Sequence, residues 1–237
     1  MADWDTFSED YDAIFLENPL YVDTIQQMLT KVEGAGGLRA LDLGCGTGNV
    51  TAALVEWAAA SAIEIVAVDP SEGMRARCAA RFAGVESVEV AQGHALGIPA
   101  AADSFDCAVS NLALHHVPPD ERAACAAELF RVLKPGGRLV YADMFCDVDA
   151  DPRNPVRVKD IVDKIVGVAM YCLDHGAYDM MQVMFSTLPA DISGEGEYLT
   201  TGDVWKGVLE AAGFGAVEVH GVPPVEFGIK IIVADKL

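Results

Sequence analysis

The stretch ALDLGCGTGNV, residues 40–50, constrains the fold of this chain more than any other feature of its sequence. An apolar run carries Asp42 near its end, and Gly44, Gly46 and Gly48 then occupy alternate positions. Glycines permit positive φ angles and let a ligand approach the backbone without a Cβ atom in the way. The spacing G-x-G-x-G differs from the G-x-G-x-x-G that suits the pyrophosphate of a dinucleotide. It therefore predicts a strand-to-helix turn that holds a smaller ligand.

Short apolar runs and amphipathic segments alternate around this turn. The runs that read as strands buried on both faces are 38–43, 63–68, 88–90, 105–109 and 137–142. Ser71 can cap a helix whose inner face carries Met74, Cys78 and Phe82. An Ala-rich helix opened by Asp120 is expected to end at the breaker KPGG, residues 134–137. Because parallel neighbours need crossover helices, this alternation predicts a doubly wound α/β sheet.

Two regions lie outside the alternation, within what we expect to be a single domain over residues 1–237. Residues 1–33 should form helices that cap one edge of the sheet, and their aromatic residues are Trp4, Phe7, Tyr11, Phe15 and Tyr21. Residues 145–199 form an insertion with helix candidates at 156–173 and 178–185. A helix at 203–212 and a strand pair at 217–220 and 228–233 then complete the sheet.

Composition and charge exclude several classes of protein. The chain has 237 residues, 52% of them apolar, and 16 basic against 36 acidic residues give a formal net charge of -20. Such a surface repels phosphate backbones, so nucleic acid is not an expected partner. The acidic start lacks the basic region of a signal peptide, and no run reaches the roughly 18 apolar residues of a membrane span. Six scattered cysteines predict buried, reduced thiols and a cytoplasmic location.

Further motifs follow the glycine turn in a fixed order. Asp69 ends the second strand 21 residues after Gly48, where a carboxylate can accept hydrogen bonds from two ribose hydroxyls. The segments ALDLGCGTG, VAVDPSEGM, GHALGIPAAADSFDCAVSNLALHHV and LKPGGRLVYAD resemble, in this order, the motifs of class I S-adenosylmethionine-dependent methyltransferases. The resemblance is strong over residues 38–144 and moderate over 200–235. It is closest to the small-molecule branch that includes ubiquinone/menaquinone-type methyltransferases.

The resemblance implies a Rossmann-like, seven-stranded, mostly parallel sheet with a C-terminal antiparallel strand, and it implies S-adenosylmethionine as cofactor. The glycine turn and Asp42 would hold the methionine part of the cofactor, and Asp69 would hold the ribose. Residues similar to those that surround the rest of the cofactor are Tyr11, Pro70, Ser71, Met74, His94, Ala95 and Asn111. Of these, Tyr11 would close over the cofactor, and Met74 reads equally well as a core residue.

One position departs from the family pattern. Similar sequences often have Gly-Asp-Ala after the third strand, where the acid receives the adenine amino group, but this chain has Gly93-His94-Ala95. A protonated histidine cannot accept that hydrogen bond, although a neutral ring has one acceptor nitrogen. Recognition of the adenine is therefore less firmly predicted than recognition of the ribose.

His115 and His116 follow the fourth strand and should point toward the mouth of the cofactor site, because open α/β sheets bind ligands beyond the carboxyl ends of their strands. One imidazole could orient or deprotonate an acceptor near neutral pH, or the pair could only shape the loop. We expect no metal here, because adjacent histidines lack a third clear ligand. The acids after the fifth strand, Asp143 among them, read as solvated side chains.

The methionine-rich insertion either closes over a small acceptor as a lid or forms a contact between the subunits of a homodimer. The acidic surface favours a neutral or cationic acceptor over a phosphorylated one. The sequence thus predicts a methyltransferase that acts on a small molecule. A protein that binds the cofactor without catalysis, a nicotinamide oxidoreductase and another reaction of the same cofactor remain alternatives.

Overall fold

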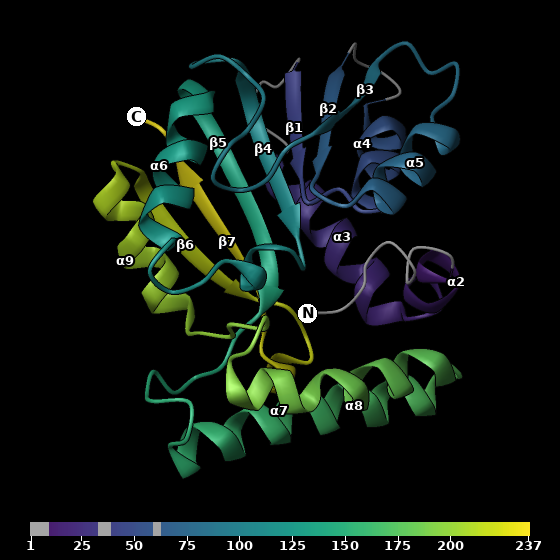
Figure 1. The fold of residues 1–237 in the computed structure, drawn as a ribbon, viewed down its shortest axis with the longest axis vertical. Coiled ribbons are helices and arrows are strands. Elements are labelled where there is room, and N and C mark those ends of the chain that lie inside the picture. Colours follow the sequence, from purple (N-terminus) through teal and green to yellow (C-terminus); the bar gives the residue numbers. More distant parts are fainter. Residues whose placement is uncertain (1–9, 33–38, 59–62) are drawn as a thin grey trace.

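The computed structural model describes residues 10–32, 39–58 and 63–237 (Figure 1). Its strands are β1 (Arg39–Leu43), β2 (Glu64–Asp69), β3 (Val88–Gln92), β4 (Phe105–Asn111), β5 (Leu133–Met144), β6 (Gly215–Gly221) and β7 (Ile229–Asp235). They form one sheet in the order β3-β2-β1-β4-β5-β7-β6. β7 pairs antiparallel with β5 and with β6, and the other pairs are parallel. The predicted seven-stranded Rossmann-like sheet is confirmed.

Helices cover both faces of this sheet. They are α2 (Tyr11–Leu16), α3 (Pro19–Val32), α4 (Asn49–Trp57), α5 (Glu72–Arg81), α6 (Arg122–Val132), α7 (Pro155–Asp174), α8 (Tyr178–Ser193) and α9 (Gly202–Ala212). Apolar residues of α3 and α4 pack on one face, and those of α6 and α9 pack on the other. Short 3-10 turns, Leu114–His116 and Val225–Phe227, follow β4 and precede β7. The sheet is therefore buried on both sides, as its apolar strands require.

Local signals in the sequence fix the start of α5. The Ser71 hydroxyl accepts a hydrogen bond from the Met74 amide at 3.1 Å, which satisfies an amide that has no partner inside the helix. Met74, Cys78 and Phe82 are all buried against the sheet, as their spacing predicts. The six cysteines are likewise buried and unpaired, so the prediction of buried thiols is confirmed.

Three expectations about the elements need correction. α3 does not cap an edge, because its apolar side packs on a face of the sheet with Val140 and Val233. Helix α8 continues past 185 and through Pro189 to Ser193. Met184, Leu188 and Ile192 keep an apolar stripe against the core, which holds the helix together although proline removes one backbone hydrogen bond. β5 begins at Leu133, before the predicted breaker. Trp4 and Phe7 lie outside the described residues.

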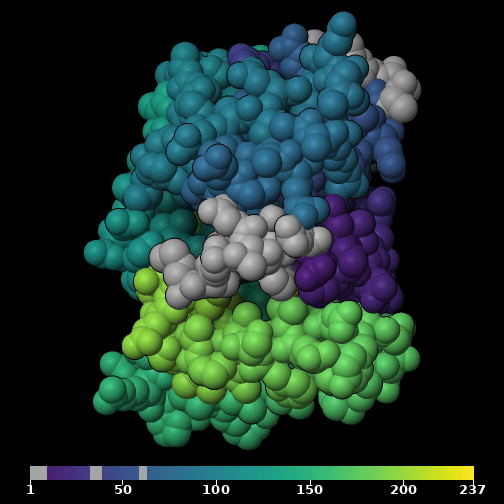
Figure 2. Space-filling view, turned by 45° about the vertical axis from the view of Figure 1, so that its right-hand side comes forward, coloured from purple at the N-terminus to yellow at the C-terminus, as the bar shows by residue number. Residues whose placement is uncertain are grey.

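The insertion lies beyond the carboxyl ends of the parallel strands. α7 and α8 pack against each other as a separate layer below the sheet in Figure 1. Figure 2 shows this green layer beside the purple N-terminal helices, and α2 contacts α8. Among the described residues, none of the helices combines the length and apolar character required to cross a bilayer. Ligands are expected at the carboxyl ends of the parallel strands. This end of the sheet is enclosed by α2, by the first turns of α3 and by the insertion.

Candidate functional site

The glycine turn joins β1 to α4 in the conformation that its sequence predicts. Gly44, Gly46 and Gly48 have φ angles of 74°, 54° and 91°, which side chains other than glycine rarely adopt. A Cβ atom on Gly44 would lie 2.4 Å from the Cβ atom of Ala113. Close packing of the turn therefore requires glycine there for a second reason.

Asp69, at the end of β2, is held against this turn. Its Oδ2 accepts a hydrogen bond from the Gly46 amide at 2.9 Å, and its Oδ1 accepts one from the Ser71 amide at 2.8 Å. Each carboxylate oxygen has further lone pairs, so Asp69 can still accept hydrogen bonds from a ligand. The carboxylate is thereby fixed in orientation before any ligand binds.

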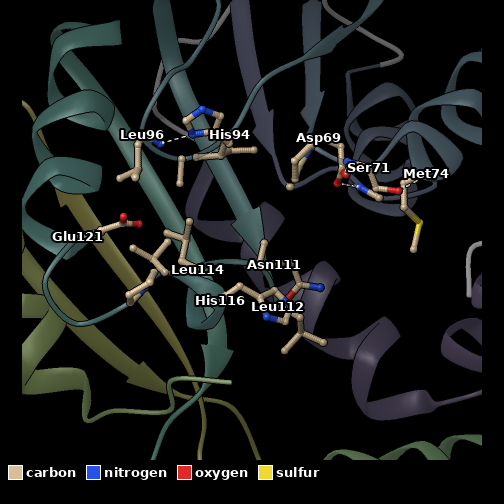
Figure 3. Close-up of a pocket in the computed structure, with 18 of the residues that line it drawn as sticks. Asp69, Ser71, Met74, His94, Leu96, Asn111, Leu112, Leu114, His116 and Glu121 are labelled. Carbon is tan, nitrogen blue, oxygen red and sulfur yellow. Dashed lines mark hydrogen bonds between the residues drawn. The ribbon is translucent and has the colours of Figure 1, made fainter. Parts of the chain in front are cut away.

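A cavity of about 270 Å³ opens beside Asp69 (Figure 3). Most of the predicted site residues line it: Tyr11, Gly44, Gly46, Asp69, Pro70, Ser71, Met74, His94, Ala95, Asn111 and His116. Leu96, Leu112, Leu114 and Glu121 also line it, and no motif in the sequence points to these four residues. Asp42, Gly48 and His115 are not part of its wall. The structure thus brings together segments that follow β1, β2, β3 and β4, and one residue of α2.

Asp42 lies in β1, two residues before Gly44, and is almost completely buried. Its Oδ2 accepts a hydrogen bond from the Thr51 hydroxyl at 2.6 Å, whereas its Oδ1 has no hydrogen-bond partner among residues 10–32, 39–58 and 63–237. Burial raises the pKa of Asp42 to about 7, although the Thr51 hydrogen bond acts in the opposite direction. The side chain is therefore partly protonated at neutral pH in the ligand-free protein.

This pKa predicts how the stability of the ligand-free protein depends on pH. Between the ordinary pKa of 3.8 and about 7, the folded state holds a proton on Asp42 that the unfolded state has lost. The free energy of unfolding should therefore fall as pH rises across this window, by at most about 1.4 kcal/mol per pH unit from this group. Asp42→Asn should reduce that slope and raise the melting temperature at pH 8. Thermal unfolding followed by circular dichroism at several pH values measures both, and a steeper slope in the variant would contradict the assignment.

Tyr11, in α2, and Met74, in α5, both line the cavity. The Tyr11 ring stacks on Phe15 with centroids 4.1 Å apart, and burial is the main reason that the pKa of Tyr11 is raised well above 10. Met74 is buried with its sulfur near the glycine turn. Met74 thus serves the core and the cavity wall at once, so the two interpretations of this residue are compatible.

In Figure 3, His94 lies between Leu96 and Asp69, and Met74 lies beyond Asp69. Its Nδ1 accepts a hydrogen bond from the Leu96 amide at 3.2 Å. The acceptor nitrogen of the neutral ring is therefore already occupied, and Nε2 carries the hydrogen. His94 can donate a hydrogen bond to a ring nitrogen, but it cannot replace a carboxylate as the acceptor for an amino group.

The two histidines after β4 have different surroundings. His115 lies between two carboxylates, with Nδ1 at 2.6 Å from Asp143 Oδ1 and Nε2 at 3.1 Å from Glu197 Oε2. His116 lines the cavity, and its Nδ1 lies 3.0 Å from the Gly196 carbonyl oxygen. Because a carbonyl oxygen only accepts, Nδ1 of His116 donates, and the acceptor lone pair of its neutral ring is on Nε2.

These surroundings shift the two pKa values in opposite directions. Burial alone would lower the pKa of His115, but the carboxylates of Asp143 and Glu197 outweigh it and raise the pKa well above 6.5. Burial, followed by the nearby charge of His115, lowers the pKa of His116. At neutral pH the pair therefore consists of a protonated His115 and a neutral His116, and the neutral ring is the one at the cavity.

Two acidic residues of this network were not recognised in the sequence. Asp143 is fully buried, not solvated as expected, and accepts hydrogen bonds from the Tyr141 hydroxyl and the His115 amide. Glu197 follows α8, 81 residues after His116, and no local pattern connects it with the histidines. The ligand atoms of His115, His116 and Glu197 lie within 4.8 Å of one another, which is close enough to surround a metal ion. Hydrogen bonds and ion pairs account for the same arrangement, so the absence of a metal stays a prediction.

Comparison with known proteins identifies the family of this chain. Residues 40–137 match a family described as a methyltransferase domain. A demethylmenaquinone methyltransferase of Clavibacter sepedonicus is 34% identical over 207 residues, which cover 84% of this chain and 76% of the relative.

Solved structures share the fold at lower identity. One is a SAM-dependent methyltransferase, possible histamine N-methyltransferase, from Thermotoga maritima, with a TM-score of 0.63, 19% identity, and coverage of 99% of this chain and 98% of that one. Another is human N-acetylserotonin methyltransferase in complex with SAM, with a TM-score of 0.64, 16% identity, and coverage of 98% and 55%. Together with the extensive match to the Clavibacter relative, the glycine turn and its cavity lead to one conclusion: this chain belongs to the S-adenosylmethionine-dependent methyltransferases.

Proposed function

We propose that this enzyme transfers the methyl group of S-adenosylmethionine to a neutral or cationic small molecule, in the cytoplasm. The observation that carries the proposal is one cavity with fixed hydrogen-bond acceptors at Asp69 and a neutral imidazole at His116. Asp69 would hold the ribose, the glycine turn the methionine part, and Met74 and Ala95 the adenine. Asp42, with one oxygen unpartnered, would receive the α-ammonium group through water or after a small movement of the turn.

Methyl transfer from a sulfonium is an in-line displacement, so alignment of acceptor, methyl carbon and sulfur supplies much of the rate. His116 would act on the acceptor, because its ring lines the cavity and its lowered pKa keeps it able to accept a proton. Protonated His115, held by Asp143 and Glu197, would be a positioning residue that keeps His116 neutral. A leaving proton would pass to Nε2 of His116.

The name of the Clavibacter relative suggests the first acceptor to assay, a reduced demethylmenaquinone. The purified protein is incubated with S-[methyl-³H]adenosylmethionine and either this quinol or a fractionated extract of small metabolites. The expected result is label in an acceptor together with S-adenosylhomocysteine. A protein that retains the nucleoside but never transfers label would be a binding protein, which would overturn the proposal.

The same assay tests the expected absence of a metal. Treatment with EDTA should leave the rate of label transfer unchanged, because imidazole and positioning need no ion. Activity that is lost in EDTA and restored by a divalent metal would instead identify His115, His116 and Glu197 as metal ligands.

A further inference from the structure

A second, smaller cavity adjoins the cofactor cavity. It has a volume of about 60 Å³ and is enclosed by α2, α3, α7, α8 and the ends of β4, β5 and β7. Asn111, the last residue of β4, and Leu112 line both cavities. Both cavities therefore border the end of β4, which the segment that carries His116 follows in the chain; Figure 3 shows Asn111, Leu112 and His116 close together on the wall of the first cavity.

The wall of the second cavity is mainly apolar; the polar residues Asn18, Tyr21 and Thr24 also belong to it, and Asn18 and Thr24 bond to the backbone of Leu20. The side chains that close it from the insertion are Val168, Met180 and Met184, and Phe15 and Leu20 close it from the N-terminal helices. Among the described residues, no carboxylate, lysine, arginine or histidine lines it. A charged group would lose its hydration there without compensation, whereas an alkyl or aryl group would gain by leaving water. Methionine side chains are unbranched and flexible, so Met180 and Met184 can adjust to groups of different size.

Asn111 is the polar group at the junction of the two spaces. It is 7% exposed, and within the part of the chain that the structure describes neither its amide nitrogen nor its amide oxygen has a hydrogen-bond partner. Buried polar side chains are nearly always satisfied, because an unsatisfied one destabilises the folded state. An amide can donate and accept, so a hydroxyl or carbonyl group of a ligand would satisfy it.

We propose that the second cavity is the acceptor subsite, and that it selects an uncharged acceptor with an apolar body. A hydroxyl or carbonyl group next to the reacting atom bonds to the Asn111 amide, and the apolar body enters the space between α8 and the end of β4. This inference rests on the proposed function, and it assigns Asn111 to the acceptor in place of the cofactor. It also gives the insertion a role in specificity, because Met180 and Met184 define the depth of the subsite.

The test uses phenol, 4-ethylphenol and 4-butylphenol as probes, because they vary the apolar body at a constant hydroxyl group. Their binding to the protein saturated with S-adenosylhomocysteine is measured by isothermal titration calorimetry. We expect the affinity to rise about fourfold for each added CH₂ group until the subsite is full. Met180→Trp should abolish this dependence on chain length without weakening S-adenosylhomocysteine binding. Met170→Trp, on an exposed position of α7, is the matched control and should keep the dependence.

Asn111→Leu tests the polar part, because leucine has a similar volume and no hydrogen-bonding atoms. It should weaken each phenol roughly tenfold and remove the preference for 4-ethylphenol over ethylbenzene. If Met180→Trp does not fold, Met184→Phe fills the same space from a half-buried position.

The possible failures are distinguishable. Equal affinity along the probe series, or unchanged length dependence in Met180→Trp, would overturn the subsite while the proposed function stands. An Asn111→Leu variant that loses S-adenosylhomocysteine binding and retains phenol binding would return Asn111 to the cofactor and overturn its assignment here. Failure of the wild-type protein to bind S-adenosylhomocysteine at all would overturn the proposed function itself.

Discussion

His116→Asn should lower the turnover number by about 10²–10⁴-fold and leave the affinity for S-adenosylmethionine within about twofold of wild type. General base catalysis by a positioned side chain contributes on this scale. The asparagine amide nitrogen takes nearly the place of Nδ1 and can still donate to the Gly196 carbonyl group, so the loop contact persists. What the variant removes is Nε2, the atom that would receive a proton from the acceptor.

The matched control for this variant is His175→Asn. The Nδ1 atom of His175 also lies beside a backbone carbonyl oxygen, that of Tyr171 at 2.8 Å, but His175 is exposed at the end of α7 and lies outside the cavity. Its variant should keep wild-type turnover. Single-turnover rates with labelled cofactor measure the effect, and calorimetry measures cofactor affinity. If His116→Asn lost cofactor binding and turnover to the same degree, the residue would have a structural role.

The pH dependence gives an independent readout of His116. In the proposed mechanism its neutral form is the base, so turnover should be lost as pH falls through its pKa in the folded enzyme. Because burial and the charge of His115 lower that pKa, the acid limb of the profile should lie below pH 6.5. The limb should be missing in His116→Asn.

The features that the sequence predicts correctly depend on neighbours along the chain. The glycine turn, the Ser71 cap and the position of Asp69 are each determined by about ten consecutive residues, because strand, turn and helix start follow one another directly. The doubly wound sheet follows from the order of such units, since parallel pairing with crossover helices leaves few other arrangements. The residues proposed to hold the cofactor can therefore be predicted from the sequence alone.

The surroundings of His115 and His116, at the proposed acceptor end of the site, cannot be predicted in this way, because they depend on contacts between segments that are distant in the sequence. Two hydrogen bonds hold the loop of Glu197 near the histidines: the Tyr198 amide donates to the His115 carbonyl group at 2.8 Å, and the Arg122 guanidinium group of α6 donates to the Tyr198 carbonyl group at 2.7 Å. The expectation that Asp143 is solvated is wrong for the same reason, because its partner His115 belongs to the segment after β4, 28 residues earlier in the chain. The unpartnered amide of Asn111 and the unpartnered Oδ1 of Asp42 have no sequence signature either. Whether a buried polar atom has a partner depends on every segment packed around it, and the local sequence does not show those segments.

These two ends of the site also differ in how the chain holds them. Asp69 is fixed by amides of the turn and of the α5 cap, which belong to the sheet body. His116 is fixed by Gly196 and Glu197, which belong to the insertion. Changes within the insertion can therefore alter the acceptor end while the cofactor end keeps its geometry, which suits a fold that serves many different acceptors.

Asp69→Ala should weaken S-adenosylmethionine binding by about 10²–10⁴-fold. Two charge-assisted hydrogen bonds to ribose hydroxyls contribute roughly 1.5–3 kcal/mol each, and the variant removes both acceptors. It also leaves the amides of Gly46 and Ser71 without the carboxylate that orients them, so the glycine turn loses part of its preorganisation. The loss should therefore exceed that of Asp69→Asn, which keeps one oxygen and nearly the same volume.

Asp106→Asn is the matched control for this pair of variants. Asp106 also lies in a strand of the sheet and also accepts a hydrogen bond from a backbone amide, that of Arg39 at 3.0 Å, but it is not part of the cavity wall. Its variant should bind S-adenosylmethionine as wild type does. Calorimetric titration gives the three affinities, and circular dichroism confirms that each variant is folded before it is compared. Wild-type affinity in folded Asp69→Ala would mean that the ribose is held elsewhere, and the orientation of the cofactor in the cavity would have to be reversed.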